Sequence, residues 1–375
     1  MRNIIHPRRK FFNQILYGGI SLGLSQNILA QNFFTPEEEI DWYDVKELGV
    51  EGKGWNDTTK YFDRLPAKAQ GVVRDRLWDL SRDSTGMCVR FISESPNIYV
   101  RYELSRKSLS MSHMAATGHS GVDLYAQDEL GMDRWVSVVR PDKQYIDSTI
   151  AKGLAPGSRR YTLYLPLRNG IESLEIGVVK GDAFQALSPR TERPIVFYGT
   201  SIINGACASR PGMAFPSILG RRLRRPTVNL GFAGNGRMEI EVGSLLAELD
   251  PCVYVIDCLP NMNESSVSER TIPLVRKIRE AHKTTPILLV EDRSYTNARF
   301  FPARKRHHQK SRKALKNAFK QLKELGINNI FYLNGDNLLG QDGEAATDGS
   351  HPSDLGMMRY ADAYEPLLRI ALKQY

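Results

Sequence analysis

The sequence has few cysteines, and their spacing matches none of the common metal-binding patterns. Its 375 residues include four, Cys88, Cys207, Cys252 and Cys258, which form neither a CxxC pair nor a cluster with histidine. Metal sites built on cysteine depend on such spacings, so we expect no metal, and no organic cofactor is implied either. Disulfides could form if the protein is exported to an oxidising compartment, a question taken up below with the first thirty residues. However, Cys252 and Cys258 flank an apolar run typical of a buried strand, where free thiols pack well. We therefore expect buried thiols.

The sequence also lacks a strong excess of charge of one sign. Lysine and arginine number 51 against 42 acidic residues, and 41% of all residues are hydrophobic. Residues 1–30 hold four basic and no acidic residues, so the net charge falls from +9 to +5 without them. A mildly basic globular protein of this composition needs no nucleic-acid partner. The chain is longer than a typical domain with a single hydrophobic core, which favours two domains.

The first thirty residues predict a secretory signal peptide. Arg2, Arg8, Arg9 and Lys10 form a basic start, and residues 11–25 form a short, mostly apolar run. Residues 28–30 then end in a small residue suited to cleavage. The apolar run is too short and too interrupted to span a bilayer comfortably. No cysteine follows the expected cleavage point, so we expect no lipid or other stable membrane anchor. The mature protein is then secreted or periplasmic.

Residues 32–188 form the first expected domain. Their apolar residues alternate with polar ones in short runs separated by turn signals, the pattern of an all-β domain. The clearest expected strands are residues 87–92, 98–102, 135–139 and 161–165. This spacing predicts a β-sandwich or jelly roll, with a two-stranded accessory hairpin as the alternative.

Residues 192–375 form the second expected domain, where short apolar strands alternate with helical stretches. The expected strands are residues 195–198, 227–230, 253–257, 287–290 and 330–333. The expected helices between them are residues 213–225, 239–249, 268–282 and 304–325. This alternation predicts an α/β domain with a parallel sheet covered on both faces. Such sheets place their chemistry at the carboxyl ends of the strands.

Residues suited to acyl-transfer chemistry follow these strands. Ser201 stands at the turn after the first strand, and a glycine-rich stretch, residues 229–236, follows the second. Asn261 follows the third strand, and Asp348 precedes His351 by three residues near the C-terminus. A serine needs a base to become a nucleophile, and backbone N–H groups near glycine can approach a substrate closely. The ordered combination predicts a serine hydrolase site.

These four segments resemble the sequence blocks of the SGNH, or GDSL-type, hydrolases. The first block is Gly199-Thr200-Ser201-Ile202, with threonine where the family usually has aspartate, and the third is Leu259-Pro260-Asn261-Met262 instead of Gly-x-Asn-Asp. In the first half, Gly121-Val122-Asp123-Leu124-Tyr125 resembles the GxDLY motif of a domain that precedes some of these esterases. The resemblance implies a flavodoxin-like, three-layer hydrolase domain preceded by a β-sandwich.

The resemblance and the chemistry assign a role to each residue. Ser201 would attack an ester carbonyl, His351 would take its proton, and Asp348 would orient the imidazole. The oxyanion would be bound by the N–H groups of Ser201 and Gly234 and by the side chain of Asn261. We expect Asp123 and Tyr125 to hold the sandwich or the domain interface. Arg210 and Arg293 are candidates to reach the cleft, but we assign neither of them a role there.

The substrate is less determined than the reaction. Export, the accessory sandwich and the lack of an evident apolar lid favour O-acetyl groups on carbohydrates, so the expected partner is a small-molecule or polysaccharide ester. A lipase or lysophospholipase is the alternative enzyme, and a hydrophobic acyl channel near Asn261 or Met262 would distinguish it. A catalytically inactive glycan-binding protein is the third possibility.

Overall fold

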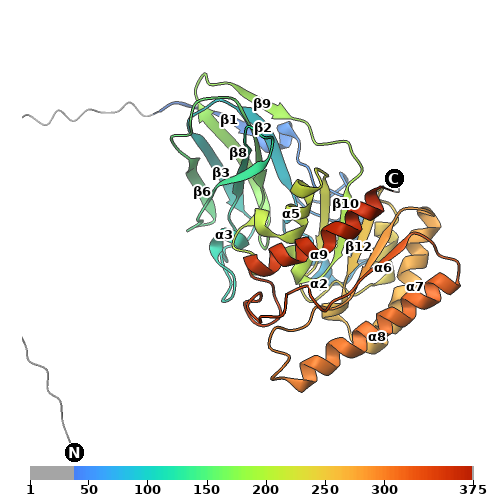
Figure 1. The fold of residues 1–375 in the computed structure, drawn as a ribbon. Helices are drawn as coiled ribbons and strands as arrows, with labels where there is room; N and C mark the ends of the chain where they lie inside the picture. The colour runs from blue at the N-terminus through green and yellow to red at the C-terminus, as the bar shows by residue number, and fades with distance from the viewer. Residues whose placement is uncertain (1–37, 374–375) are drawn as a thin grey trace, which may run out of the picture. The chain divides into compact units, whose positions relative to one another are not determined.

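The computed structural model describes residues 38–373, in which a strand-rich part precedes an alternation of strands and helices (Figure 1). The expected signal peptide lies outside these residues. From Glu39 onward the chain belongs to one compact unit. Within residues 38–373, no helix combines the length and the apolar character needed to cross a bilayer.

The first part is a sandwich of two antiparallel sheets, as the alternating pattern predicts. One sheet has the order β1-β8-β3-β6 and the other β5-β4-β7-β2-β9. The strands are β1 Ile40–Asp44, β2 Cys88–Ser93, β3 Ile98–Leu104, β4 Asp123–Gln127, β5 Asp133–Val138, β6 Tyr145–Ala151, β7 Arg159–Tyr164, β8 Ile171–Val179 and β9 Phe184–Leu187. Alternate residues point between the sheets, where Val100, Phe91 and Leu163 are fully buried in one core. Short helices α1 Val45–Leu48, α2 Asp75–Leu80 and α3 Ala116–His119 lie in the connections.

The second part is a five-stranded parallel sheet with the order β11-β10-β12-β13-β14. Its strands are β10 Ile195–Gly199, β11 Thr227–Gly231, β12 Val253–Asp257, β13 Ile287–Val290 and β14 Ile330–Leu333. Gly199 pairs with Gly231 of β11 and with Asp257 of β12. The chain segments that follow these three strands therefore begin next to one another, at the carboxyl ends of the strands.

Helices cover both faces of this sheet, which gives the three-layer α/β fold (Figure 1). The helices are α4 Ser201–Asn204, α5 Phe215–Arg222, α6 Ile240–Leu246, α7 Glu264–Ala281, α8 Pro302–Glu324 and α9 Asp354–Leu372. Ile195 and Phe197 of β10 pack in the core shared with α5 and α9, whereas Val196 and Tyr198 pack in the core shared with α6, α7 and α8. Strands buried on both faces explain the continuous apolar runs in the sequence.

Asp123 of the GxDLY segment joins the sandwich to the hydrolase part. Its fully buried carboxylate accepts hydrogen bonds from the N–H of Gly212 at 2.8 Å and from Arg210 at 3.1 Å. Arg210 also donates to the hydroxyl of Tyr125. Of the two roles expected for Asp123 and Tyr125, these contacts fit the one between the sandwich and the hydrolase part.

Arg64 makes a second junction between the two parts. Its buried guanidinium donates to the carbonyls of Asn229 and Gly231, each at 2.9 Å, and to those of Asp83 and Leu80. Because Asn229 and Gly231 belong to β11, this arginine attaches the strand-rich part directly to the parallel sheet. The two parts therefore share buried polar contacts close to the edge where the chemistry is expected.

The cysteines are free thiols, as expected, but they are not all buried. Cys88, Cys252 and Cys258 are buried, whereas Cys207 is partly exposed. Burial raises the pKa of the Cys207 thiol to about 11. That thiol is therefore protonated at neutral pH and is a poor nucleophile.

Candidate active site

Ser201 lies just after the carboxyl end of β10, which is flanked by β11 and β12, and is the first residue of the short helix α4. The side chain of the preceding Thr200 accepts the N–H of Ile202 at 3.2 Å and so caps this helix. Threonine thus supplies a local hydrogen bond of the kind that the usual aspartate could make. Ser201 is 8% exposed, which leaves its hydroxyl accessible from one side.

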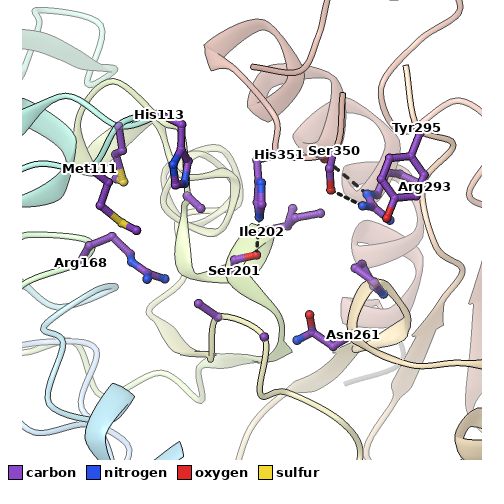
Figure 2. Close-up of a pocket in the computed structure, with 15 residues that line it drawn as sticks. Met111, His113, Arg168, Ser201, Ile202, Asn261, Arg293, Tyr295, Ser350 and His351 are labelled. Atoms are coloured by element: carbon purple, nitrogen blue, oxygen red, sulfur yellow. Dashed lines mark hydrogen bonds between the residues drawn. The ribbon is translucent and has the colours of Figure 1, made fainter. Parts of the chain in front are cut away.

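Ser201, His351 and Asp348 form a continuous hydrogen-bonded chain. The Ser201 hydroxyl lies 2.8 Å from Nε2 of His351, and Nδ1 of the same ring lies 2.7 Å from Oδ2 of Asp348 (Figure 2 shows the first of these contacts). The structure therefore brings together two segments that are 150 residues apart in the sequence.

The loop that carries Asp348 and His351 is held by its own hydrogen bonds. Oδ1 of Asp348 accepts the N–H of His351 at 2.8 Å and that of Ser350 at 2.9 Å. Gly349 has a φ of +85°, a conformation that glycine adopts without the strain a side chain would add. Residues 348–351 thus form a tight turn, and this turn places the Asp348 carboxylate next to the His351 imidazole.

The surroundings of Asp348 keep its carboxylate ionised. Partial burial by itself would raise its pKa, but the N–H of His351 and the imidazole outweigh this effect and lower the pKa to about 2. A permanently charged carboxylate at Nδ1 favours the tautomer whose Nε2 is free to accept the serine proton.

Hydrogen-bond donors gather on the other side of Ser201. Gly234 lies in the turn after β11 with a φ of +67°, and its N–H has no protein acceptor within residues 38–373. Asn261 ends the short helical turn η3 Leu259–Asn261 and donates one amide hydrogen to the carbonyl of Gly236 at 3.3 Å. Its second amide hydrogen remains available. Gly234 and Asn261 line the same cavity as Ser201.

This cavity has a volume of about 350 Å³ and is lined by both parts of the protein. From the sandwich come Met111, His113, Met114 and Arg168. From the hydrolase part come Ser201, Ile202, Ala206, Ala233, Gly234, Pro260, Asn261, Arg293, Tyr295, Ser350 and His351. Met262 instead packs in the core beneath and is 3% exposed. Of these two neighbouring residues, Asn261 therefore lines the cavity and Met262 does not.

Arg293, which the sequence left unassigned, lines the cavity. It follows β13, is 2% exposed and forms an ion pair with the adjacent Asp292. It also donates to the side chain of Ser350 and, at 3.4 Å, to the carbonyl of that residue (Figure 2). Because Ser350 precedes His351, Arg293 supports the loop that carries the imidazole. Its place at a strand end was the sequence signal for this role.

The sandwich residues of the cavity were not predicted. The rings of His113 and His351 lie 5.8 Å apart, and Met111 and Met114 exchange backbone hydrogen bonds in the tight loop around His113. No local motif indicates which loop of a sandwich will face a second domain. Arg210 does not line the cavity and belongs to the interface described above.

A serine, an imidazole and a carboxylate at the carboxyl edge of a doubly covered parallel sheet are the arrangement of α/β serine hydrolases. Residues 192–369 match the GDSL-like lipase/acylhydrolase family, and residues 40–184 match the GxDLY N-terminus of SGNH-hydrolase-type esterases. The chain therefore belongs to the SGNH/GDSL-type esterase family with a GxDLY-type N-terminal domain. No curated protein matches the sequence.

Solved structures share the two-part fold. A protein from Bacteroides ovatus described as a GDSL-like lipase is 29% identical, with a TM-score of 0.85 over 89% of this chain and 98% of its own. The salicylyl-acyltransferase SsfX3 of a tetracycline biosynthetic pathway is 17% identical, with a TM-score of 0.68 over 86% and 94%. A family two carbohydrate esterase from Cellvibrio japonicus is 12% identical, with a TM-score of 0.58 over 90% and 99%.

Proposed function

We propose that this protein is an exported serine esterase that removes O-acetyl groups from carbohydrates, with Ser201 as nucleophile. The observation that carries the proposal is the hydrogen-bonded chain from Ser201 through His351 to Asp348 at the wall of a cavity. The basic and apolar start of the sequence supports export.

In the acylation step, His351 takes the proton of Ser201 as the hydroxyl attacks the ester carbonyl. The imidazolium that forms is stabilised by the carboxylate of Asp348. The N–H groups of Ser201 and Gly234 and the Asn261 amide receive the negative charge on the carbonyl oxygen. His351 then returns the proton to the leaving alcohol, which leaves the acyl group on Ser201.

In the deacylation step, water replaces the alcohol in the cavity. His351 takes a proton from this water, which attacks the acyl-serine carbonyl, and the same donors stabilise the second oxyanion. Collapse of that intermediate breaks the bond to Ser201, and the proton held by His351 returns to the serine oxygen. Carboxylic acid is released, and the enzyme regains its starting form without any cofactor.

Two features support a small acyl group on a sugar. The cavity lining includes the small or rigid residues Ala233, Gly234 and Pro260 together with Asn261, a composition that favours a short acyl group. The fold is also shared with a family two carbohydrate esterase. The cavity wall includes residues of the sandwich as well as of the hydrolase part, which leaves a surface for an alcohol larger than the acyl group.

The test is acetate release from a panel of acetylated plant polysaccharides, with p-nitrophenyl acetate and p-nitrophenyl palmitate as reference esters. We expect acetate release from at least one polysaccharide and no activity in Ser201→Ala, with unchanged thermal unfolding. Cleavage of the palmitate alone would make the protein a lipase. Binding to the polysaccharides without any ester cleavage would make it a glycan-binding protein.

A further inference from the structure

Arg168 is a positively charged residue of the cavity wall, and most of its guanidinium N–H donors are not used within the described part of the protein. It lies in the connection between β7 and β8 of the sandwich, where its N–H donates to the carbonyl of His119 at 3.0 Å. Its side chain makes one long hydrogen bond, 3.4 Å, to Oδ1 of Asn204. Within residues 38–373 its other guanidinium hydrogens have no protein acceptor. The backbone is therefore fixed, while most of the guanidinium is free to bind a ligand.

Within the described residues no carboxylate forms an ion pair with Arg168, although the charge of Asp83 partly offsets the effect of burial on its pKa. None of the residues that line the cavity in the described chain is acidic. The nearby Asp83 forms an ion pair with Arg106, and the other cavity arginine, Arg293, is paired with Asp292. Burial lowers the pKa of Arg168 because desolvation disfavours its charged form. An anionic ligand would restore the lost stabilisation of that charge.

The position of Arg168 indicates which part of the substrate it meets. Figure 2 shows Arg168 and Asn261 on opposite sides of Ser201. The carbonyl oxygen faces Asn261 in the proposed mechanism, while the leaving oxygen must reach His351 to receive a proton. The sandwich residue His113 lies beside His351, with the two rings 5.8 Å apart. The alcohol part of the ester therefore extends toward the sandwich wall that carries Arg168.

We propose that Arg168 binds a carboxylate on the alcohol part of the substrate, so that the esters cleaved are those of acidic sugars such as uronic acids. A planar guanidinium can form two parallel hydrogen bonds with a carboxylate, and this geometry favours arginine over lysine. The inference rests on the proposed esterase function and assigns its substrate class. Arg168 is thus a specificity-determining residue contributed by the N-terminal domain.

The test compares two acetylated sugars that differ at one carbon. Acetylated methyl galacturonide carries a carboxylate where acetylated methyl galactoside carries a hydroxymethyl group. We expect wild-type kcat/KM to favour the acidic sugar by about tenfold or more, the contribution of a hydrogen bond to a charged group. Arg168→Gln should abolish this preference mainly through KM, and Arg168→Lys should retain part of it.

Arg160→Gln is the matched control. Arg160 lies on β7 of the same domain and is exposed, and the substitution removes the same charge outside the cavity. It should keep the wild-type preference. Added salt should weaken the preference in wild type and control alike, because it screens the charge of Arg168.

The results that would refute the role of Arg168 differ from those that would refute the proposed esterase function. Equal kcat/KM ratios for the two sugars in wild type and Arg168→Gln would refute the role of Arg168 while leaving the esterase intact. A preference for p-nitrophenyl hemisuccinate over p-nitrophenyl acetate that depends on Arg168 would place the carboxylate on the acyl side and also refute it. Failure of the wild type to cleave any ester would remove the proposed function itself.

Discussion

Replacing Asp348 by asparagine separates the charge of this side chain from its role in holding the loop. The asparagine oxygen can still accept the N–H groups of Ser350 and His351. Its amide nitrogen would then face Nδ1 of His351, and because two donors cannot bond, the ring would adopt the tautomer protonated at Nε2. That nitrogen cannot take the proton of Ser201. We expect Asp348→Asn to fold normally and to lose most of its kcat.

The size of the loss follows from the exposure of the carboxylate. In triads whose acid is buried, the same substitution lowers kcat by about 10⁴-fold. The side chain of Asp348 is 42% exposed, so water already screens part of its interaction with the imidazolium. We therefore expect a loss of about 10²–10³-fold, or roughly 2.7–4 kcal/mol in the activation free energy.

The assay is steady-state hydrolysis of p-nitrophenyl acetate at neutral pH, with thermal unfolding measured in parallel. Asp342→Asn is the control, because Asp342 is a half-exposed carboxylate that pairs with Arg359 away from the imidazole. It should leave kcat unchanged. If Asp348→Asn kept kcat within about threefold of wild type while folding normally, the carboxylate would not orient the base, and the tautomer argument would be wrong.

Asp348 also makes stability depend on pH. Its folded pKa of about 2 lies below the ordinary value of 3.8, so ionised Asp348 stabilises the fold above the ordinary value. This contribution is lost as the pH falls from about 4 to about 2. The difference in free energy of unfolding between wild type and Asp348→Asn should therefore shrink over that interval in urea titrations. A constant difference would contradict the lowered pKa.

Three further substitutions test the surroundings of Ser201. Asn261→Ala should lower kcat by about 10²–10³-fold through the lost oxyanion donor; a change confined to KM would reduce Asn261 to a binding residue. Arg293→Gln leaves Asp292 as a buried, unpaired charge, so it should lower the free energy of unfolding by about 3–5 kcal/mol. It should also reduce kcat, because Arg293 supports the loop of His351. Wild-type values in urea unfolding and in kinetics would contradict this. Arg64→Met removes the guanidinium that donates to four buried carbonyls, of which that of Leu80 keeps the N–H of Asp83, and should destabilise the protein by about 3 kcal/mol or more in urea unfolding. An unchanged midpoint would show that the junction is dispensable.

The parallel sheet was predictable because its signal is local. Each strand is a short, mostly apolar run, and all except β14 are fully buried. The expected strand at residues 253–257 is observed as β12 Val253–Asp257. The expected helix at residues 304–325 begins two residues earlier and ends one residue earlier, at Pro302 and Glu324. Patterning places the centre of a helix well, whereas its ends depend on capping contacts.

The C-terminal helix α9 was not predicted, although part of its signal was present. Met357, Tyr360, Ala361 and Tyr364 follow helical spacing and are buried against the sheet. Pro366 interrupts this pattern and is normally unfavourable inside a helix, because it removes one backbone donor. Burial of the apolar stripe against the sheet offsets that loss, and such a tertiary effect cannot be derived from the segment alone.

The site was predictable only where strand ends dictate it. Ser201, Gly234 and Asn261 follow three adjacent strands whose carboxyl ends are in register, so parallel topology brings them together. Arg168 and His113 come from loops of the other domain. Their approach depends on the buried interface contacts between the domains, which have no counterpart in local spacing.

The most direct test of the central claim is labelling with a fluorophosphonate, which reacts with activated serines. If Ser201 is the nucleophile, the intact protein should carry one label, located at Ser201 by peptide mass spectrometry, and His351→Gln should not be labelled. A protein that remains unlabelled, or that carries the label at another serine, would contradict the assignment of Ser201 as the nucleophile.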